Sequence, residues 1–302
     1  MVVFLRSPWQ SSRSKITSIV KFMNTFIQYL LPQHTVSRIM GALASCKISW
    51  FKKWGINKFI RDYQVDMSLA QEPNPLNYVD FHHFFTRALK PELRPITQEP
   101  NALASPADGV ISQIGNVEAN SILQAKGFTY DVTALLGGSR DHAALFNGGG
   151  FATVYLAPKD YHRVHMPFSG KLLEMIYVPG RLFSVNQTTA ESVPNLFTRN
   201  ERVVALFETA MGPMAVILVG AFFVGGIITV WHGAVTPPHG GDVRRWQYQT
   251  QDIQLQRGAE MGRFQMGSTV IVLVGSKQLE WLQTLQAGSS VQFGQLLGTI
   301  LG

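Results

Sequence analysis

The sequence predicts an α+β protein in which N-terminal amphipathic helices are followed by a β-rich domain. Apolar residues keep a helical spacing through most of the first sixty residues. From Leu103 onward, short β-branched runs alternate with Gly, Pro and Asn, which is typical of a domain built from many short strands. The chain has 302 residues, enough to bury a sizeable core. We therefore divide it into a helical region of residues 1–62 and a β-rich domain of residues 63–302.

The composition excludes several classes of protein. Hydrophobic residues make up 46% of the chain and charged residues 15%, whereas an average domain is about a quarter charged. A disordered chain, a collagen-like chain and a coiled coil are therefore excluded. The single cysteine, Cys46, rules out a disulfide framework and a metal site made of several thiolates.

Three apolar patterns predict the N-terminal helices. The first ends before Pro32, and the other two lie on either side of Cys46. Their apolar residues are Ile16, Ile19, Val20, Met23, Phe26, Ile27, Leu30 and Leu31, then Val36, Ile39, Met40 and Leu43, then Trp50, Phe51, Trp54, Phe59 and Ile60.

The helical region also carries all of the excess positive charge. Residues 1–61 contain ten Lys and Arg and no Asp or Glu, which leaves 16 basic and 19 acidic residues in the rest of the chain. Basic residues opposite a Trp, Phe and Leu face are typical of a helix lying in a membrane interface. Each contributes about 1 kcal/mol near an anionic leaflet. We therefore expect amphipathic membrane-binding helices with an anionic membrane surface as their partner.

Three other interpretations of the helical region replace the membrane by a different partner or role. Helices packed on the main domain with a solvated basic face would give the same pattern. A mitochondrial presequence is also basic and free of acidic residues, although it usually stops sooner and is richer in Ser. Nucleic acid is not expected as a partner, because the aromatic residues lie among aliphatic ones rather than on a polar face.

Residues 62–101 read as a polar connection with short helices, and strands are expected after it. The clearest strand candidates are the β-branched runs at 109–112, 152–156, 203–207 and 269–274. The segment from Thr209 to Gly241 has no Asp, Glu, Lys or Arg and is long enough to span a bilayer. Its glycines and β-branched residues instead favour two buried strands that divide at Gly225-Gly226, although periodicity alone does not settle the choice.

Three segments carry residue types suited to catalysis. Gly267-Ser268 places a hydroxyl beside an unhindered carbonyl at the start of a strand, His162 and His165 lie between two prolines, and Asp108 precedes a glycine at a strand end. Asp108, His165 and Ser268 are the residue types of an acid–base–nucleophile relay. Taken singly, each has a structural reading as a turn or a satisfied side chain, and the sequence alone does not show that the three meet. No metal site is expected, because the H-x-x-H pair lacks an obvious third ligand.

Taken together in their order along the chain, these segments make the sequence resemble the phosphatidylserine decarboxylases of the bacterial, membrane-associated type. The resemblance runs from about Tyr29 to the C-terminus. It is most specific at residues 106–109, 160–167, 200–203, 212–214, 229–231 and 261–269, which read PADG, DYHRVHMP, NERV, GPM, TVW and MGRFQMGST. Met266 stands where the family usually has Leu, and Ile228 stands where bacterial members carry Glu. We therefore assign no catalytic role to position 228.

The resemblance implies a proenzyme that cuts itself between Gly267 and Ser268. Asp108 would orient His165, and His165 would act as the base on the Ser268 hydroxyl. The products would be a β chain of residues 1–267 and an α chain of residues 268–302 that begins with a pyruvoyl group derived from Ser268. The β-rich domain would thus be the catalytic domain, formed by both chains.

The resemblance also implies the reaction and its location. The pyruvoyl carbonyl would bind the amine of phosphatidylserine and accept the electrons released as CO2 leaves, giving phosphatidylethanolamine. His162 would take part as a proton donor or as an orienting group for the carboxylate. The enzyme would lie peripherally on the cytoplasmic face of a bacterial inner membrane, and a homodimer is compatible with this. The alternatives are an uncleaved lipid-binding protein of the membrane surface and a lipid-directed serine hydrolase on the same scaffold.

Overall fold

A computed structural model describes residues 28–29, 31–222, 226–236, 241–265 and 268–301. Most of the first predicted helix, at residues 16–31, lies outside the described residues, and so does Gly267.

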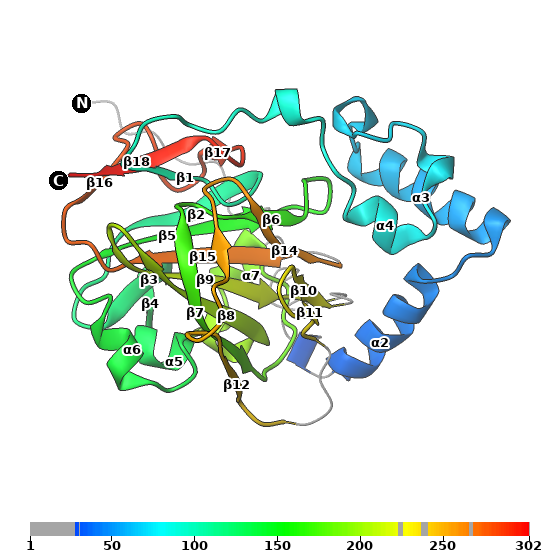
Figure 1. The fold of residues 1–302 in the computed structure, drawn as a ribbon. Coiled ribbons are helices and arrows are strands. Elements are labelled where there is room, and N and C mark those ends of the chain that lie inside the picture. Colours follow the sequence, from blue (N-terminus) through cyan, green and yellow to red (C-terminus); the bar gives the residue numbers. More distant parts are fainter. Residues whose placement is uncertain (1–27, 30, 223–225, 237–240, 266–267, 302) are drawn as a thin grey trace, which may run out of the picture.

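The second and third apolar patterns form helices, as predicted. Helix α2 spans Gln33–Ala44 and α3 spans Ser49–Tyr63, ending at Gln64 in the left-handed conformation (φ 54°). The polar connection contains the short helix α4, Phe81–Phe85, and three 3₁₀ turns, Met67–Leu69, Pro75–Asn77 and Pro91–Leu93. Helices α2, α3 and α4 lie together on one side of the β-rich domain (Figure 1). The boundary at residues 62/63 stays a prediction; α3 ends beside it.

A small aromatic core holds α3 against α4. Ile56, Val65 and Phe84 are buried there. The Phe59 ring of α3 contacts the rings of Phe84 and Phe85 with centroid distances of 6.0 and 5.8 Å, at angles near the edge-to-face arrangement that aromatic pairs prefer. α4 is therefore fixed to α3 on one side, while its C-terminal end reaches toward the β-rich domain.

The β-rich domain is built on a nine-stranded sheet. Its order is β12-β7-β8-β9-β15-β5-β2-β17, with β13 paired to β7, and all of its pairs are antiparallel. Smaller sheets have the orders β1-β18-β16, β11-β10-β14-β6 and β3-β4. The strands are β1 Ala102–Ala104, β2 Gly109–Asn116, β3 Ser121–Ala125, β4 Phe128–Asp131, β5 Gly150–Leu156, β6 Arg163–His165, β7 Gly170–Val178, β8 Arg202–Thr209, β9 Gly212–Gly220, β10 Ile227–Thr229, β11 Gly233–Ala234, β12 Arg244–Gln247, β13 Gln254–Leu255, β14 Glu260–Phe264, β15 Ser268–Val274, β16 Leu279–Trp281, β17 Ser290–Val291 and β18 Leu296–Ile300. Four short helices complete the domain: α5 Val132–Leu135, α6 Arg140–Ala144, α7 Gln187–Ala190 and α8 Leu196–Arg199.

The central strands are buried on both faces of this sheet. In β15, Ile271 and Leu273 belong to one core cluster, whereas Val270 and Val272 belong to a second cluster on the opposite face. The same alternation runs through β8 and β9. Two covered faces explain why these segments read as continuous apolar runs rather than as an alternation of polar and apolar residues.

Burial on both faces of the sheet also decides between the two interpretations of the uncharged segment from Thr209 to Gly241, a membrane-spanning segment or two buried strands. It forms β9 and the short strand β10, as predicted, with residues 223–225 outside the described part. Among the described residues, no helix is both long enough and apolar enough to cross a membrane.

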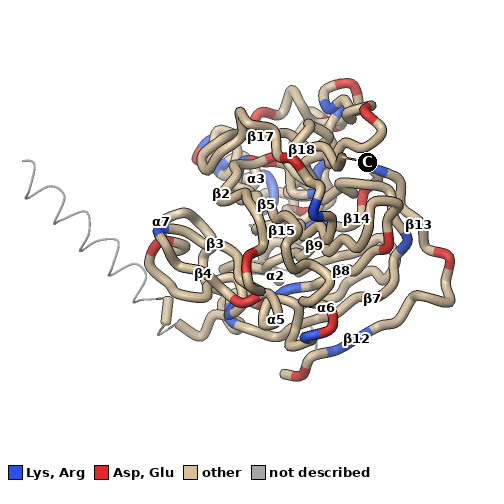
Figure 2. Tube along the Cα trace, turned by 90° about the vertical axis from the view of Figure 1, so that its left-hand side faces the viewer, with Lys and Arg blue, Asp and Glu red and all other residues tan. Residues whose placement is uncertain are grey.

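On the face shown in Figure 2, Lys and Arg are interspersed with Asp and Glu along the β-rich domain.

Gly109 is required by a close approach of two strands. A Cβ atom added there would lie 2.3 Å from the backbone oxygen of Tyr155 and 3.0 Å from Cγ1 of Val154. On the same strand, a Cβ at Gly115 would meet Phe151 at an ordinary 3.5 Å. The glycine that follows Asp108 therefore allows β2 to pack closely on β5.

We expect Gly109→Ala to lower the free energy of unfolding by about 1–3 kcal/mol, because overpacking forces the two strands apart. Gly115→Ala is the matched control on the same strand and should cost clearly less. Urea unfolding of both variants checks this. Equal stabilities of the two variants would contradict the close approach.

Candidate active site

Ser268 lies at the start of the central strand β15, as its sequence context predicted. Its backbone pairs with Gly220 of β9 on one side and with Leu156 of β5 on the other. The residue is fully buried, and its hydroxyl has no hydrogen-bond partner among the described residues. Buried polar side chains usually have a partner, so an unpartnered hydroxyl at this position calls for a chemical explanation.

His162 reaches the same end of the sheet through the loop after β5. Its Nε2 donates to the carbonyl of Ala157 over 3.1 Å, and Ala157 directly follows the residue paired with Ser268. The imidazole stacks on Phe85 with ring centroids 4.1 Å apart, and its Nδ1 has no partner in the described part of the chain. Complete burial, together with the nearby charge of Arg87, lowers the pKa of His162 to about 3. The ring is therefore neutral, with a free acceptor at Nδ1.

His165 is held by contacts on both of its ring nitrogens. Nδ1 donates to the carbonyl of Gly258 over 2.8 Å, and Nε2 accepts from the Tyr161 hydroxyl over 3.0 Å. The ring lies flat on Phe293, with centroids 3.9 Å apart and planes 8° apart. Burial lowers the pKa of His165, and the bond to Gly258 opposes part of this shift. His165 is thus the neutral tautomer that would take a proton at Nε2.

Asp108 contacts the site through other residues. Its carboxylate accepts from Arg94 Nε and Nη2, the latter over 2.6 Å, and from the backbone N–H of Phe293 over 2.9 Å. In the structure both nitrogens of His165 bond to other groups, Nδ1 to the Gly258 carbonyl and Nε2 to the Tyr161 hydroxyl. Asp108 instead fixes the residue whose ring stacks on His165. The direct Asp108–His165 contact stays a prediction.

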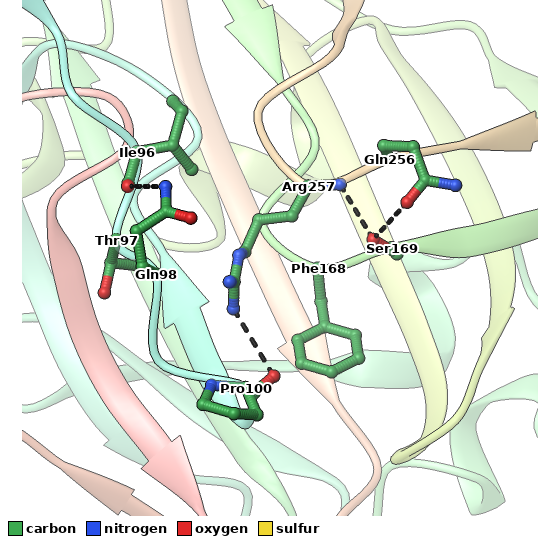
Figure 3. A pocket seen from close by; sticks show the side chains of 8 residues that line it. All are labelled: Ile96, Thr97, Gln98, Pro100, Phe168, Ser169, Gln256 and Arg257. Carbon is green, nitrogen blue, oxygen red and sulfur yellow. Dashed lines mark hydrogen bonds between the residues drawn. The ribbon is translucent and has the colours of Figure 1, made fainter.

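The residue before Gly258, Arg257, is anchored through its backbone N–H, which bonds to Ser169, and through its guanidinium, which lies beside Pro100 (Figure 3). Arg257 Nη1 donates to the carbonyls of Glu99 and Ala102 over 2.7 and 2.9 Å, and the Arg257 N–H donates to the Ser169 hydroxyl over 2.9 Å. Gly258 has a positive φ of 83°, at which a side chain would be strained. The turn that orients His165 is therefore anchored to the segment before β1.

Several residues of this site were not predicted. Phe85, Arg94 and Phe293 lie far from the motifs in sequence and have no local signal. Tyr161 stands within the DYHRVHMP segment, so its place there could have marked it. Among the described residues, His162 and His165 share no hydrogen-bond partner. These residues also contain no group of three or more His, Cys, Asp or Glu that could hold a metal ion.

The chain is similar to one family of proteins over most of its length. A family model described as phosphatidylserine decarboxylase matches residues 81–299, and a model described as PSD matches residues 23–64. The chain is 56% identical over 274 residues to a phosphatidylserine decarboxylase proenzyme of Ectopseudomonas mendocina (strain ymp), covering 90% of this chain and 96% of the relative. It is 55% identical over 273 residues to the proenzyme of Pseudomonas fluorescens (strain Pf0-1), covering 89% and 95%.

The burial of His162 predicts a dependence of stability on pH. The unfolded ring has a pKa of about 6.5, and the folded one has a pKa of about 3. Between these two pH values the unfolded chain binds one more proton than the folded chain, so protonation favours unfolding. The stability that depends on the neutral ring is therefore complete only above pH 6.5. It falls with pH by up to about 1.4 kcal/mol per pH unit.

We expect His162→Phe to lessen this fall, because Phe keeps the stacking on Phe85 and has no proton to bind. Urea unfolding between pH 7 and pH 4.5 measures it, with Ser268→Ala present in both proteins to keep the chains uncut. Parallel pH profiles of the two proteins would count against a buried neutral ring.

Proposed function

Because the chain belongs to the phosphatidylserine decarboxylase family, we propose that its activity depends on a pyruvoyl group made from its own Ser268. The protein is a phosphatidylserine decarboxylase, and the resemblance seen in the sequence is confirmed. The proposal concerns how it works: cleavage between Gly267 and Ser268, followed by conversion of phosphatidylserine to phosphatidylethanolamine and CO2.

One observation carries this proposal. The Ser268 hydroxyl is buried, lacks a partner among the described residues and begins a strand directly after Gly267. A serine kept for structure would be expected to bond its hydroxyl to a neighbour. A serine that is consumed in a reaction needs a free oxygen, and the burial of Ser268 would shield the resulting carbonyl group from water.

The cleavage can be written with all atoms balanced. A base removes the Ser268 hydroxyl proton, the oxygen attacks the Gly267 carbonyl carbon, and the peptide C–N bond breaks to give an ester and a free amine. Loss of the Ser268 α-proton then breaks the ester C–O bond, leaving a carboxylate on Gly267 and a dehydroalanine at position 268. Addition of water and loss of ammonia turn the dehydroalanine into the pyruvoyl group. His165 Nε2 is the ring atom with a lone pair, since Nδ1 carries a proton, and it would act as the base once the Tyr161 hydroxyl that bonds to it gives way.

In the second reaction, the pyruvoyl carbonyl supplies an electron sink for the bond that breaks as CO2 leaves. His162 suits the proton transfers around it. Its free Nδ1 can accept a hydrogen bond from the headgroup amine once that amine has lost its proton. Since burial disfavours the charged ring, a protonated His162 would give up its proton readily, as the proton-donor role implied by the family resemblance requires.

The outer surface of α2 and α3 fits a membrane partner. Large apolar side chains are exposed there, with the greatest exposed fractions at Trp50 (71%) and Trp54 (58%), and with Ile39, Leu43 and Ile48 beside them in sequence. If these helices were simply packed against the main domain, they would bury such residues. We therefore propose peripheral attachment to an anionic bilayer, on the cytoplasmic face of a bacterial inner membrane.

The serine hydrolase alternative differs in its chemistry at Ser268. A hydrolase would keep an intact chain with a serine that reacts with fluorophosphonates. The pyruvoyl enzyme instead has a carbonyl that reacts with hydroxylamine or borohydride.

We expect denaturing intact-mass measurement of freshly purified protein to give two fragments, residues 1–267 and residues 268–302. The smaller should be lighter than a serine-terminated peptide by the mass difference between serine and a pyruvoyl group. Ser268→Ala should give one uncut, inactive chain, because it lacks the attacking oxygen. A single full-length mass from active protein would overturn the cleavage proposal.

We expect the double variant Trp50→Ser/Trp54→Ser to bind phosphatidylglycerol vesicles at least about tenfold more weakly, because two interfacial anchors are lost. Leu145→Ser/Val243→Ser is the matched control, since it removes exposed apolar side chains of the β-rich domain. Vesicle sedimentation measures both. Equal binding by the two variants would place the membrane contact elsewhere.

A further inference from the structure

A cavity of about 220 Å³ lies beside the candidate active site. Its wall includes Asp108 and Tyr161 of the site, Gln64 at the end of α3, and Arg87, which follows α4. It therefore joins the membrane-facing helices to the residues around His165. None of the reactions described above assigns it an occupant.

Arg87 is the unusual member of this wall. The residue is only 4% exposed. Its Nη2 donates to the carbonyl of Lys159 over 2.9 Å and, at 3.4 Å, to that of Asp160. Its Nε and Nη1 are buried and have no partner among the described residues. A guanidinium has five N–H donors, so most of this group's hydrogen-bonding capacity is unused.

Another buried arginine in the same chain shows what full pairing looks like. Arg202 is 2% exposed, and all three of its nitrogens donate to backbone carbonyls. Its Nε, for example, bonds Leu135 over 2.7 Å. Where this fold buries a guanidinium for structure, it satisfies the group. Arg87 differs from Arg202 because its Nε and Nη1 lack hydrogen-bond partners, which a ligand would supply.

The guanidinium carbon of Arg87 lies 5.5 Å from the centroid of the Phe84 ring, and the carboxylates around the cavity bond to other groups. Asp108 is paired with Arg94, and Asp66 is exposed and bonded to Ser68. Asp160 accepts from the backbone N–H of Ala157, and no ion pair to Arg87 forms within the described part of the chain. Burial lowers the pKa of Arg87, and the nearby Tyr78, Asp160 and Asp108 oppose part of this shift. The wall holds three carboxylates and three cations, so its formal charges balance: Asp66, Asp108, Asp160, Arg87, Arg94 and Lys159. What Arg87 offers a ligand is therefore its two unpartnered nitrogens.

We propose that this cavity binds the headgroup phosphodiester of phosphatidylserine, with Arg87 donating to its oxygens; this rests on the proposed function. Arg87 holds the loop 157–162, which carries His162 and begins next to the residue paired with Ser268. The phosphate and the carboxylate of the substrate are both oxyanions. The carboxylate leaves as neutral CO2, so a cation on it would stabilise the ground state and oppose the reaction. The phosphate keeps its charge throughout.

The location also suits a lipid. Gln64 in the cavity wall ends the same helix that exposes Trp50 and Trp54, and α3 and α4 lie on the same side of the β-rich domain (Figure 1). A headgroup entering from the bilayer surface would meet Arg87 before it reached the end of β15.

Equilibrium binding tests the cavity without requiring catalysis. The probe is dihexanoyl-phosphatidylethanolamine, which has the phosphate and no carboxylate, titrated by calorimetry into the uncut Ser268→Ala chain. Adding Arg87→Gln should weaken binding by about tenfold to a hundredfold, as expected for loss of a charged hydrogen-bond donor. Arg245→Gln, which removes an exposed arginine on β12 at the other edge of the sheet, is the matched control and should bind like the parent.

Kinetics of the processed enzyme give the second measurement. Arg87→Gln should raise KM for phosphatidylserine and the inhibition constant for phosphatidylethanolamine by the same factor, with kcat much less affected. A rise for phosphatidylserine alone would place the carboxylate on Arg87 and overturn the proposal. So would values equal to those of Arg245→Gln. Failure of the wild-type chain to cut itself would instead refute the proposed function, and the binding measurement on uncut chain would still stand.

A second variant covers the case in which Arg87→Gln does not fold. Leu69→Trp enlarges a partly exposed residue of the cavity wall and leaves every contact of Arg87 in place. It should reduce phosphatidylethanolamine binding at least tenfold by filling the space. Unchanged affinity in a folded Leu69→Trp chain would show that the headgroup lies outside the cavity.

Discussion

Burial of β15 on both faces of the nine-stranded sheet is the constraint on which the rest of the structure depends. The strand lies between β5 and β9, and its side chains enter two separate cores. Its first residue, Ser268, is therefore held at a fixed place, away from water, with its backbone paired on both sides. In the proposed cleavage, the bond that breaks lies just before this strand and would be anchored on its C-terminal side by an element that is buried along its whole length. After cleavage, the same pairing would keep the new N-terminus in the site.

Around this point the fold leaves polar atoms without partners. The Ser268 hydroxyl, Nδ1 of His162 and two nitrogens of Arg87 are all buried and unpartnered among the described residues. Each would destabilise a protein whose only requirement was to fold, because buried polar groups lose their bonds to water. Ser268 lies at the end of β15, beside the strand end of β5 from which the loop to His162 starts, and this is where the proposed reactions would take place. Burial also keeps both histidines neutral, which is the form that accepts a proton.

The two regions of the chain complement each other through α4. The aromatic core around Phe59 fixes α4 to α3, and the last residue of α4, Phe85, stacks on His162. The helix α3, which exposes Trp50 and Trp54, is thus connected to His162 by direct ring contacts. In the proposed membrane attachment, this connection would set the distance between the membrane surface and the reacting atoms.

The sequence by itself predicted the main elements and the residues that we propose to react. Helical spacing predicted α2 and α3, and β-branched runs predicted β2, β5, β8, β9 and β15, because both signals are local and repeat along the chain. Motif order predicted the enzyme family and singled out Ser268, His162, His165 and Asp108. Only the tertiary structure decided the partners of these residues. Gly258 lies 93 residues from His165, and Phe293 lies 185 residues from Asp108. Which of two such distant segments meet depends on sheet register and on the packing of the loops, and no local pattern records either.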